Sequence, residues 1–148
     1  DVAPSRGLGD VYKRQAVNRS LGQPFEEDVY MIRVRWELEE AVALMDLYFR
    51  YGATLSVPND ELLKLSQIYR NRANILGLNV DDKFRNLSGM KMQLGCIHYV
   101  VTGGKEGMSG ASNLFYKTYD LYKNNPCEFQ NVCEKFYAAY ERNDISIH

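Results

Sequence analysis

The stretch RWELEEAVALMDLYFRYG, residues 35–52, decides the fold class. Its apolar side chains recur at the three- and four-residue spacing of a helix, at Ala41, Leu44, Met45, Tyr48 and Tyr51. The acidic side chains fall on other faces, and those of the first turn suit the positive end of the helix dipole. Gly52 is typical of a helix end. The stretch therefore predicts an amphipathic helix that has to bury one face against other elements.

Four more helices are predicted after it. The apolar pattern gives spans of about 60–76, 89–101 and 111–124 and a last helix from Pro126, with Asn59, Ser88 and Asn125 as N-caps. Asn125, Pro126 and Glu128 form a start like a capping box, with proline where a helix tolerates it. Residues 102–113 hold four glycines and predict a loop. A short strand is possible only at 29–34, so we expect an all-α, compact bundle of about five helices.

The helix expected at 89–101 has two contrasting stripes. Met90, Leu94, Ile97 and Val101 form the stripe expected to face the core. The stripe expected to face solvent consists of Lys91, Gly95, His98 and Thr102. Trp36 is expected to be largely buried where the first helix meets the others.

The N-terminal residues resemble a translated sequencing adapter. The segment SRGLGDVYKRQ, residues 5–15, is similar to the translation of a transposase adapter used for sequencing libraries, which suggests an environmental, metagenomic fragment. We therefore expect 1–15 to be an artefact, 16–32 a leader or translated upstream DNA, 33–142 a single helical domain and 143–148 a tail. Met31 is a possible native start, and a disordered native leader is the alternative.

Composition excludes few functions. Without residues 1–15 the chain carries 15 basic and 17 acidic residues, a net charge of −2, which neither indicates nor excludes a nucleic-acid partner. The three cysteines form no CxxC pair, so neither a disulfide framework nor a zinc site is expected, and the protein is expected to be cytoplasmic. No apolar run approaches the ~20 residues of a membrane span.

Catalytic and cofactor motifs are missing from the sequence. Its histidines are His98 and His148, and it contains no HExxH or P-loop pattern. The stretch TGGKEG, residues 102–107, lacks the spacing of a phosphate-binding loop. The pair Asp81–Asp82 is expected to be a solvated acidic turn and not a cation site. We therefore expect no enzyme activity, no metal and no cofactor.

Charge is unevenly distributed along the chain. Residues 26–61 hold nine acids and three basic residues, a net charge of −6, whereas residues 64–105 hold seven basic residues and two acids, a net charge of +5. The basic excess falls on the second and third helices of the predicted domain. In a tri-helical helix-turn-helix domain these are the helices next to DNA. The alternative is that the charges only solvate helix surfaces.

Two motifs resemble known DNA-associated domains. Residues 35–52, with Trp36 followed by Glu39 and Glu40, look like the first helix of Myb/SANT-like helix-turn-helix domains. FRNLSGMKMQLGCIHYV, residues 84–100, together with ELLKLSQI, residues 61–68, resembles the N-terminal domain ahead of HNH nuclease modules in bacterial McrA-like restriction proteins. The order of Lys91 and Met92 is inverted relative to that pattern, and the chain contains no HNH motif. The resemblance implies a helix-turn-helix-like N-terminal half and a DNA-targeting module without the nuclease, which would be a covalent or separate partner.

These observations together predict a DNA-binding surface. The residues expected to contact phosphates are Lys64, Arg70, Arg72, Lys83 and Arg85, and those expected near the groove are Lys91, Gln93 and His98. For Arg85 there is an alternative, a buried pair with Glu39 or Glu40. The rival function is a protein-interaction module that uses a tyrosine-rich helical surface, formed by Tyr116, Tyr119, Tyr122, Tyr137 and Tyr140. These tyrosines are also typical of half-buried packing residues.

Overall fold

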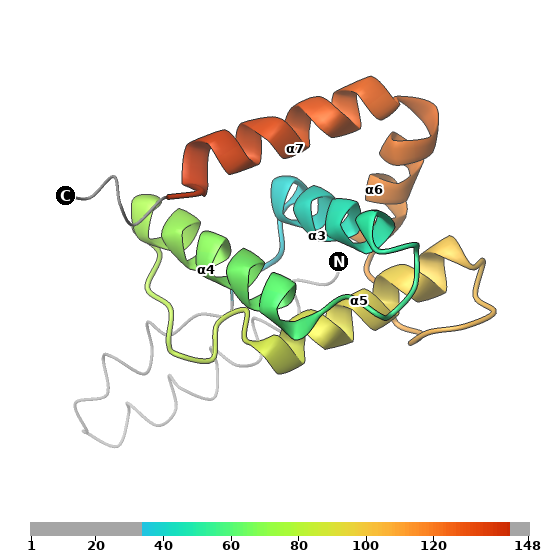
Figure 1. Ribbon diagram of the computed structural model, residues 1–148, viewed down its shortest axis with the longest axis horizontal. Coiled ribbons are helices and arrows are strands. Elements are labelled where there is room, and N and C mark those ends of the chain that lie inside the picture. The colour runs from blue at the N-terminus through green and yellow to red at the C-terminus, as the bar shows by residue number, and fades with distance from the viewer. Residues whose placement is uncertain (1–33, 143–148) are drawn as a thin grey trace, which may run out of the picture.

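The computed structural model describes residues 34–142, which form an all-helical bundle (Figure 1). Its five helices are α3 (Leu38–Arg50), α4 (Asn59–Ile75), α5 (Leu87–Val101), α6 (Asn113–Asn124) and α7 (Pro126–Tyr140), and this part of the chain contains no strand. The expected all-α bundle is thus confirmed. Val34 is not in a strand, and the rest of the possible strand, the adapter-like segment, the leader with Met31 and the tail lie outside the described residues.

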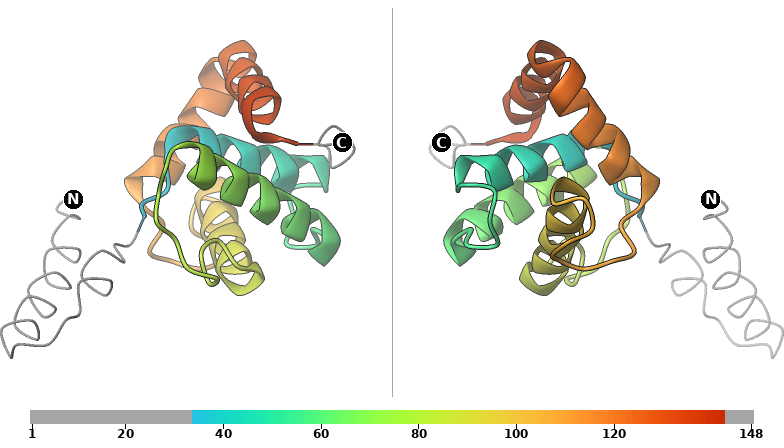
Figure 2. Two further views of the ribbon diagram at one scale, coloured as in Figure 1. Left: turned by 90° about the vertical axis from the view of Figure 1, so that its left-hand side faces the viewer. Right: turned by 90° about the vertical axis from the view of Figure 1, so that its right-hand side faces the viewer.

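Helix α3 is the centre of the bundle. It contacts each of the other four helices, while α5 and α7 lie on opposite sides of it and do not touch (Figures 1 and 2). Every residue from Glu40 to Met45 is buried, so this helix is enclosed almost all round. The apolar stripe of residues 35–52 therefore forms the middle of the core and not merely one wall of it.

The helix ends agree with local sequence signals in part. Asn125 accepts a hydrogen bond from the Glu128 amide at 3.2 Å, and Pro126 occupies the first turn of α7, which confirms the predicted start. Ser88 is not the cap of α5, because the Asn86 side chain accepts from the Gly89 amide at 2.8 Å and α5 begins at Leu87. At α4 the N-cap position is Pro58, and Asn59 is the first helical residue.

Aromatic packing closes the bundle around α3. Trp36 precedes the helix and meets Tyr69 edge to face at a centroid distance of 5.2 Å. It is therefore largely buried where the start of α3 meets α4 and α6, as expected. Near the C-terminal end of α3, Phe49 stacks on Tyr122 with centroids 4.1 Å apart. Such pairs add about 0.5–1.5 kcal/mol beyond the area they bury.

The connection between α4 and α5 is long. It runs over residues 76–86, whereas the turn of a helix-turn-helix motif has about three or four residues. Helices α3, α4 and α5 nevertheless all contact one another. The N-terminal half is therefore a three-helix unit with an extended link before its third helix.

The three cysteines differ in environment. Cys96 and Cys133 are buried, and Cys127 is exposed in the first turn of α7. Burial raises the pKa of the Cys96 thiol, and burial together with nearby Asp46 raises the pKa of Cys133 to about 12. Both buried thiols therefore stay protonated at neutral pH.

Candidate functional site

Arg85 lies inside the protein and not on its surface. Its side chain is only 7% exposed, and its guanidinium makes two 3.0 Å hydrogen bonds to the fully buried carboxylate of Glu40. It also donates to the carbonyls of Val34 and Arg35 and lies 4.4 Å from the ring centres of Trp36 and Phe84. The predicted exposed position of Arg85 is wrong, and the alternative pairing with Glu40 is the one that the structure contains.

The backbone at Arg85 supports the same conclusion. Its φ angle is +49°, in the left-handed region that non-glycine residues seldom adopt, and its carbonyl accepts a 2.6 Å hydrogen bond from the Ser66 hydroxyl. Such a backbone persists only where the surroundings strongly favour it. The pair between Arg85 and Glu40 thus fixes the loop that leads into α5.

Arg72 is the second buried arginine. Its side chain is 6% exposed, donates to Glu39 and also approaches Glu37 and Glu40. These acids raise the pKa of Arg72, although burial alone would lower it. The predicted surface position of Arg72 is therefore also wrong: it joins α4 to the start of α3.

Arg70 has three of its five N–H donors bonded to carbonyls of the chain itself. Its guanidinium donates to the carbonyls of Asp81, Asp82 and Phe84, at 3.2, 2.8 and 2.8 Å. These bonds tie the long connection before α5 to α4. Arg70 is partly exposed, and its other two N–H donors make no hydrogen bond within residues 34–142, so it stays a surface candidate as well as a structural residue.

His98 is also internal. Its Nδ1 atom lies 2.7 Å from the Tyr48 hydroxyl and its Nε2 atom 2.9 Å from Glu106 Oε1, so both ring nitrogens have partners. Burial, with smaller contributions from Tyr119 and Glu106, raises the pKa of Tyr48 to about 12. With Tyr48 donating to Nδ1, the Nε2–H of a neutral ring donates to Glu106. The expected groove position of His98 is wrong, because the ring links α3 to the glycine loop.

The glycine loop, residues 102–112, explains why that stripe of α5 is covered. The Met108 amide donates to the Gly95 carbonyl at 3.0 Å, and Met108 packs against Gly95. A Cβ on Gly107 would come within 2.6 Å of the Gly95 carbonyl oxygen and the Tyr99 nitrogen. The loop and α5 thus meet backbone to backbone, and Gly95 and His98 lie beneath the loop instead of facing solvent.

Besides Arg70, four of the predicted site residues remain accessible. Lys83, Lys91 and Lys64 are exposed, and Gln93 is partly buried. Lys64 pairs with Glu61 at 3.5 Å, whereas neither Lys83 nor Lys91 has a salt bridge within residues 34–142. Ser88 and Met92 share the exposed N-terminal half of α5 with Lys91. The candidate surface, defined here as Lys83, Ser88, Lys91 and Met92, is called the α5 surface below.

Most tyrosines of the alternative hypothesis, a tyrosine-rich protein-interaction surface, pack against the core. Tyr119, Tyr122, Tyr137 and Tyr140 are partly buried against the core, as the packing interpretation expects. Tyr116 alone among the five is exposed, at 44%. A continuous tyrosine surface is therefore not present on α6 and α7.

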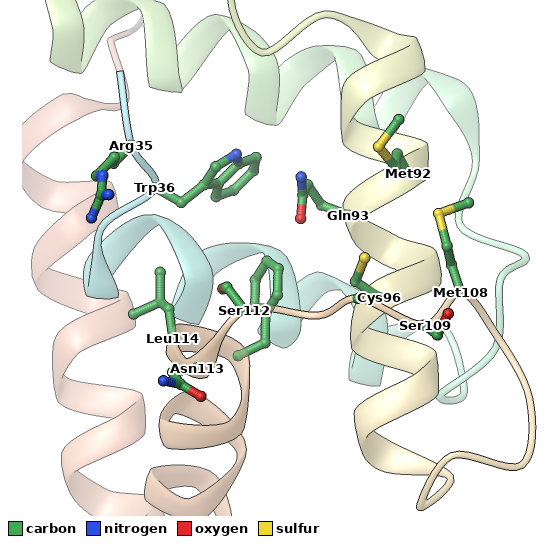
Figure 3. A pocket seen from close by; sticks show the side chains of 12 residues that line it. Arg35, Trp36, Met92, Gln93, Cys96, Met108, Ser109, Ser112, Asn113 and Leu114 are labelled. Atoms are coloured by element: carbon green, nitrogen blue, oxygen red, sulfur yellow. The ribbon is translucent and has the colours of Figure 1, made fainter. Parts of the chain in front are cut away.

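A cavity adjoins the α5 surface. It has a volume of about 710 Å³ and lies between α5, the glycine loop, the start of α6 and the segment before α3 (Figure 3). No prediction from sequence included it, because its walls come from four separate segments. Apart from Gln93, none of its lining residues was a predicted site residue.

The remaining findings are negative. In the described part of the chain no three His, Cys, Asp or Glu side chains are grouped as metal ligands would be. None of the helices between residues 34 and 142 combines the length and apolar character needed to cross a bilayer. The chain matches none of the family models, curated proteins or solved structures with which it was compared.

Proposed function

We propose that the protein is a non-catalytic DNA-binding module of prokaryotic restriction or defence type, and that it contacts DNA through the α5 surface. The observation that carries this proposal is the pair of exposed lysines, Lys83 and Lys91, without acidic partners in the described residues. They belong to a sequence stretch, 83–105, that contains no acid at all. The resemblance to domains that precede HNH nuclease modules implies a nuclease partner. This nuclease would be on the same polypeptide or would be a separate protein.

The exposed half of α5 is the half that a recognition helix uses. In helix-turn-helix proteins the N-terminal residues of that helix contact base edges in the major groove. Here Ser88, Lys91 and Met92 are exposed in the first half of α5, while the glycine loop covers part of the second half. Lys83, in the connection just before the helix, would contact a phosphate.

Two arginines support this surface indirectly. Arg70 holds the connection at three carbonyls, and Arg85 holds the same connection against Glu40. The backbone that carries Lys83 is thereby held against α4 and α3, and both of these helices contact α5. A fixed surface loses less conformational entropy on binding than a flexible one.

A salt titration of DNA binding tests the proposal. The full chain is titrated onto a DNA duplex at several salt concentrations, alongside Lys83→Ala, Lys91→Ala and the matched control Lys135→Ala. Lys135 is an exposed lysine of α7, a helix that does not contact α5. Each α5-surface variant should lower the affinity and reduce the salt slope by about one unit, as expected for a lost phosphate contact.

Two results would count against the proposal. Equal losses for Lys83→Ala, Lys91→Ala and Lys135→Ala would indicate charge attraction without a defined surface. Duplex binding that is absent, or that does not depend on salt, would remove the DNA function and favour a protein partner.

A further inference from the structure

The cavity beside α5 has an apolar floor. Cys96 and Phe115 are buried, and the thioethers of Met92 and Met108 lie at its edge on α5 and the glycine loop (Figure 3). Trp36 also lines it, and Arg85 lies 4.4 Å from the centre of the indole ring. Flexible thioethers and aromatic rings adapt well to the flat faces of a ring system.

Five polar side chains line the same cavity, those of Arg35, Gln93, Ser109, Ser112 and Asn113. Arg35, Gln93 and Asn113 make no side-chain hydrogen bond or salt bridge to any residue between 34 and 142. Gln93 comes from α5, Asn113 from the first turn of α6 and Arg35 from the segment before α3. An apolar floor with a few polar groups in its wall is the usual composition of a small-ligand site.

The chemistry of these groups restricts the ligand. A carboxamide can donate and accept at once, which matches the edge of a nucleobase. A guanidinium favours a phosphate. The aromatic and thioether floor favours a flat ring, and no lining residue carries a negative charge that would repel an anion.

We infer that this cavity binds one unstacked nucleobase, with its edge at Gln93 and its phosphate at Arg35. The nucleotide has two possible sources, a free mononucleotide or an unpaired nucleotide of a DNA strand. Met92 belongs both to the cavity and to the α5 surface, so a strand bound at Lys91 passes near the cavity. The inference goes beyond duplex binding by the α5 surface and is tested separately from it.

Trp36 reports on the cavity because it is the only tryptophan of the sequence. Its fluorescence in the full chain is followed during titration with a short single-stranded oligodeoxyadenylate, with an abasic oligomer of equal length, and with deoxyadenosine monophosphate. The abasic oligomer keeps the phosphates and lacks the bases. The oligodeoxyadenylate should change the emission and bind about tenfold more tightly than the abasic oligomer, as expected for one bound base.

The mononucleotide separates the two sources. The same emission change with the mononucleotide identifies a site for free nucleotides, and a change with the oligomer alone identifies a strand-bound nucleotide. No change with either, or equal affinity for the abasic oligomer, overturns the inference.

Two variants locate the site. Ser109→Phe places a large side chain at the exposed mouth of the cavity, and Gln93→Leu removes the amide with little change in size. Each should weaken oligodeoxyadenylate binding about tenfold and leave abasic binding unchanged. Ser56→Phe, at an exposed serine that does not line the cavity, is the matched control.

These variants also distinguish this inference from the proposed duplex binding. If Lys91→Ala weakens duplex binding as proposed while Gln93→Leu has no effect on any titration, only the cavity inference fails. If the duplex does not bind but Gln93→Leu weakens oligodeoxyadenylate binding, the cavity inference holds without the duplex function. A circular-dichroism melt of each variant shows whether it folds. If Ser109→Phe does not fold, the Gln93→Leu titration alone decides the inference.

Discussion

The basic residues of one sequence segment occupy two different regions of the molecule. Arg72 and Arg85 lie inside, against the acids at the start of α3, whereas Lys83 and Lys91 lie outside without salt bridges in the described part of the chain. Lys83 and Arg85 are only two positions apart. A count of positive charge along the sequence treats these four residues alike. In the structure, the two arginines hold the fold together through buried ion pairs, and the two lysines are exposed.

The difference follows from side-chain chemistry. A guanidinium is planar, always charged, weakly hydrated and offers five donors, so it can satisfy several buried acceptors at once. Arg85 does this with two carboxylate oxygens and two carbonyls. A lysine ammonium is more strongly hydrated and remains at the surface. Arginines next to a cluster of acids are therefore poor evidence for a DNA surface, and isolated lysines are better evidence.

The largest effect is expected for the buried arginines, of which Arg85 is tested. Arg85→Met removes the partner of the fully buried Glu40, and an uncompensated buried charge should cost about 3–5 kcal/mol of unfolding free energy. Chemical denaturation followed by circular dichroism measures it. The double variant Arg85→Met with Glu40→Leu should recover part of the loss, because both charges are then gone. A loss below about 1 kcal/mol in the single variant would mean that Arg85 belongs with the surface lysines.

A smaller effect is expected at His98. His98→Ala leaves the buried Tyr48 hydroxyl without its acceptor, and we expect a loss of about 1–3 kcal/mol in a thermal or denaturant melt. Glu106→Gln is the matched change at the other end of this chain of hydrogen bonds. The Glu106 side chain is 70% exposed, so that variant should lose less than about 1 kcal/mol. Equal losses would mean that the ring is held mainly by Glu106.

The glycine loop covers α5 where its exposed half ends. Alanine substitutions at two glycines of the loop test this close contact. Gly107 and Gly110 have nearly equal φ angles, +95° and +94°, so alanine strains the backbone at both. A Cβ on Gly107 also meets backbone at 2.6 Å, whereas one on Gly110 meets nothing within 4 Å. Gly107→Ala should therefore lower the stability by about 1 kcal/mol more than Gly110→Ala. No difference in their melts would show that the loop moves freely over α5.

The smallest effect is expected in the outer region. Lys83→Ala and Lys91→Ala should change the free energy of unfolding by no more than about 0.5 kcal/mol, because neither lysine has a salt bridge in the described residues. The denaturation experiments used for Arg85→Met measure these variants as well. A loss above about 1 kcal/mol would make the lysines part of the fold, and a weaker DNA affinity could then not be assigned to lost contacts.

Local signals in the sequence were enough to predict the helices. Apolar spacing predicted five helices, and Asn125, Pro126 and Glu128 predicted the start of α7. The cap of α5 was misplaced by two residues, at Ser88 instead of Asn86, because both residues are good caps and only the observed bond decides between them.

The site was predicted less well, for physical reasons. A stripe such as Lys91, Gly95 and His98 shows which residues share a helix face, but not whether another segment covers that face. The covering loop contacts α5 through glycine backbones, which leave no side-chain pattern to detect. Burial of Arg85 was foreseen only as an alternative, since its partner Glu40 is 45 positions away. The cavity gave no signal because its walls come from distant segments.

The different environments of the three cysteines have a practical consequence for conjugation chemistry. A maleimide reacts with thiolates, and burial keeps Cys96 and Cys133 protonated by raising their pKa values. Cys127 is exposed on α7, a helix that does not contact α5. The unaltered chain should therefore accept a dye or a surface tether at one position, and immobilisation through Cys127 leaves the α5 surface and the adjoining cavity accessible.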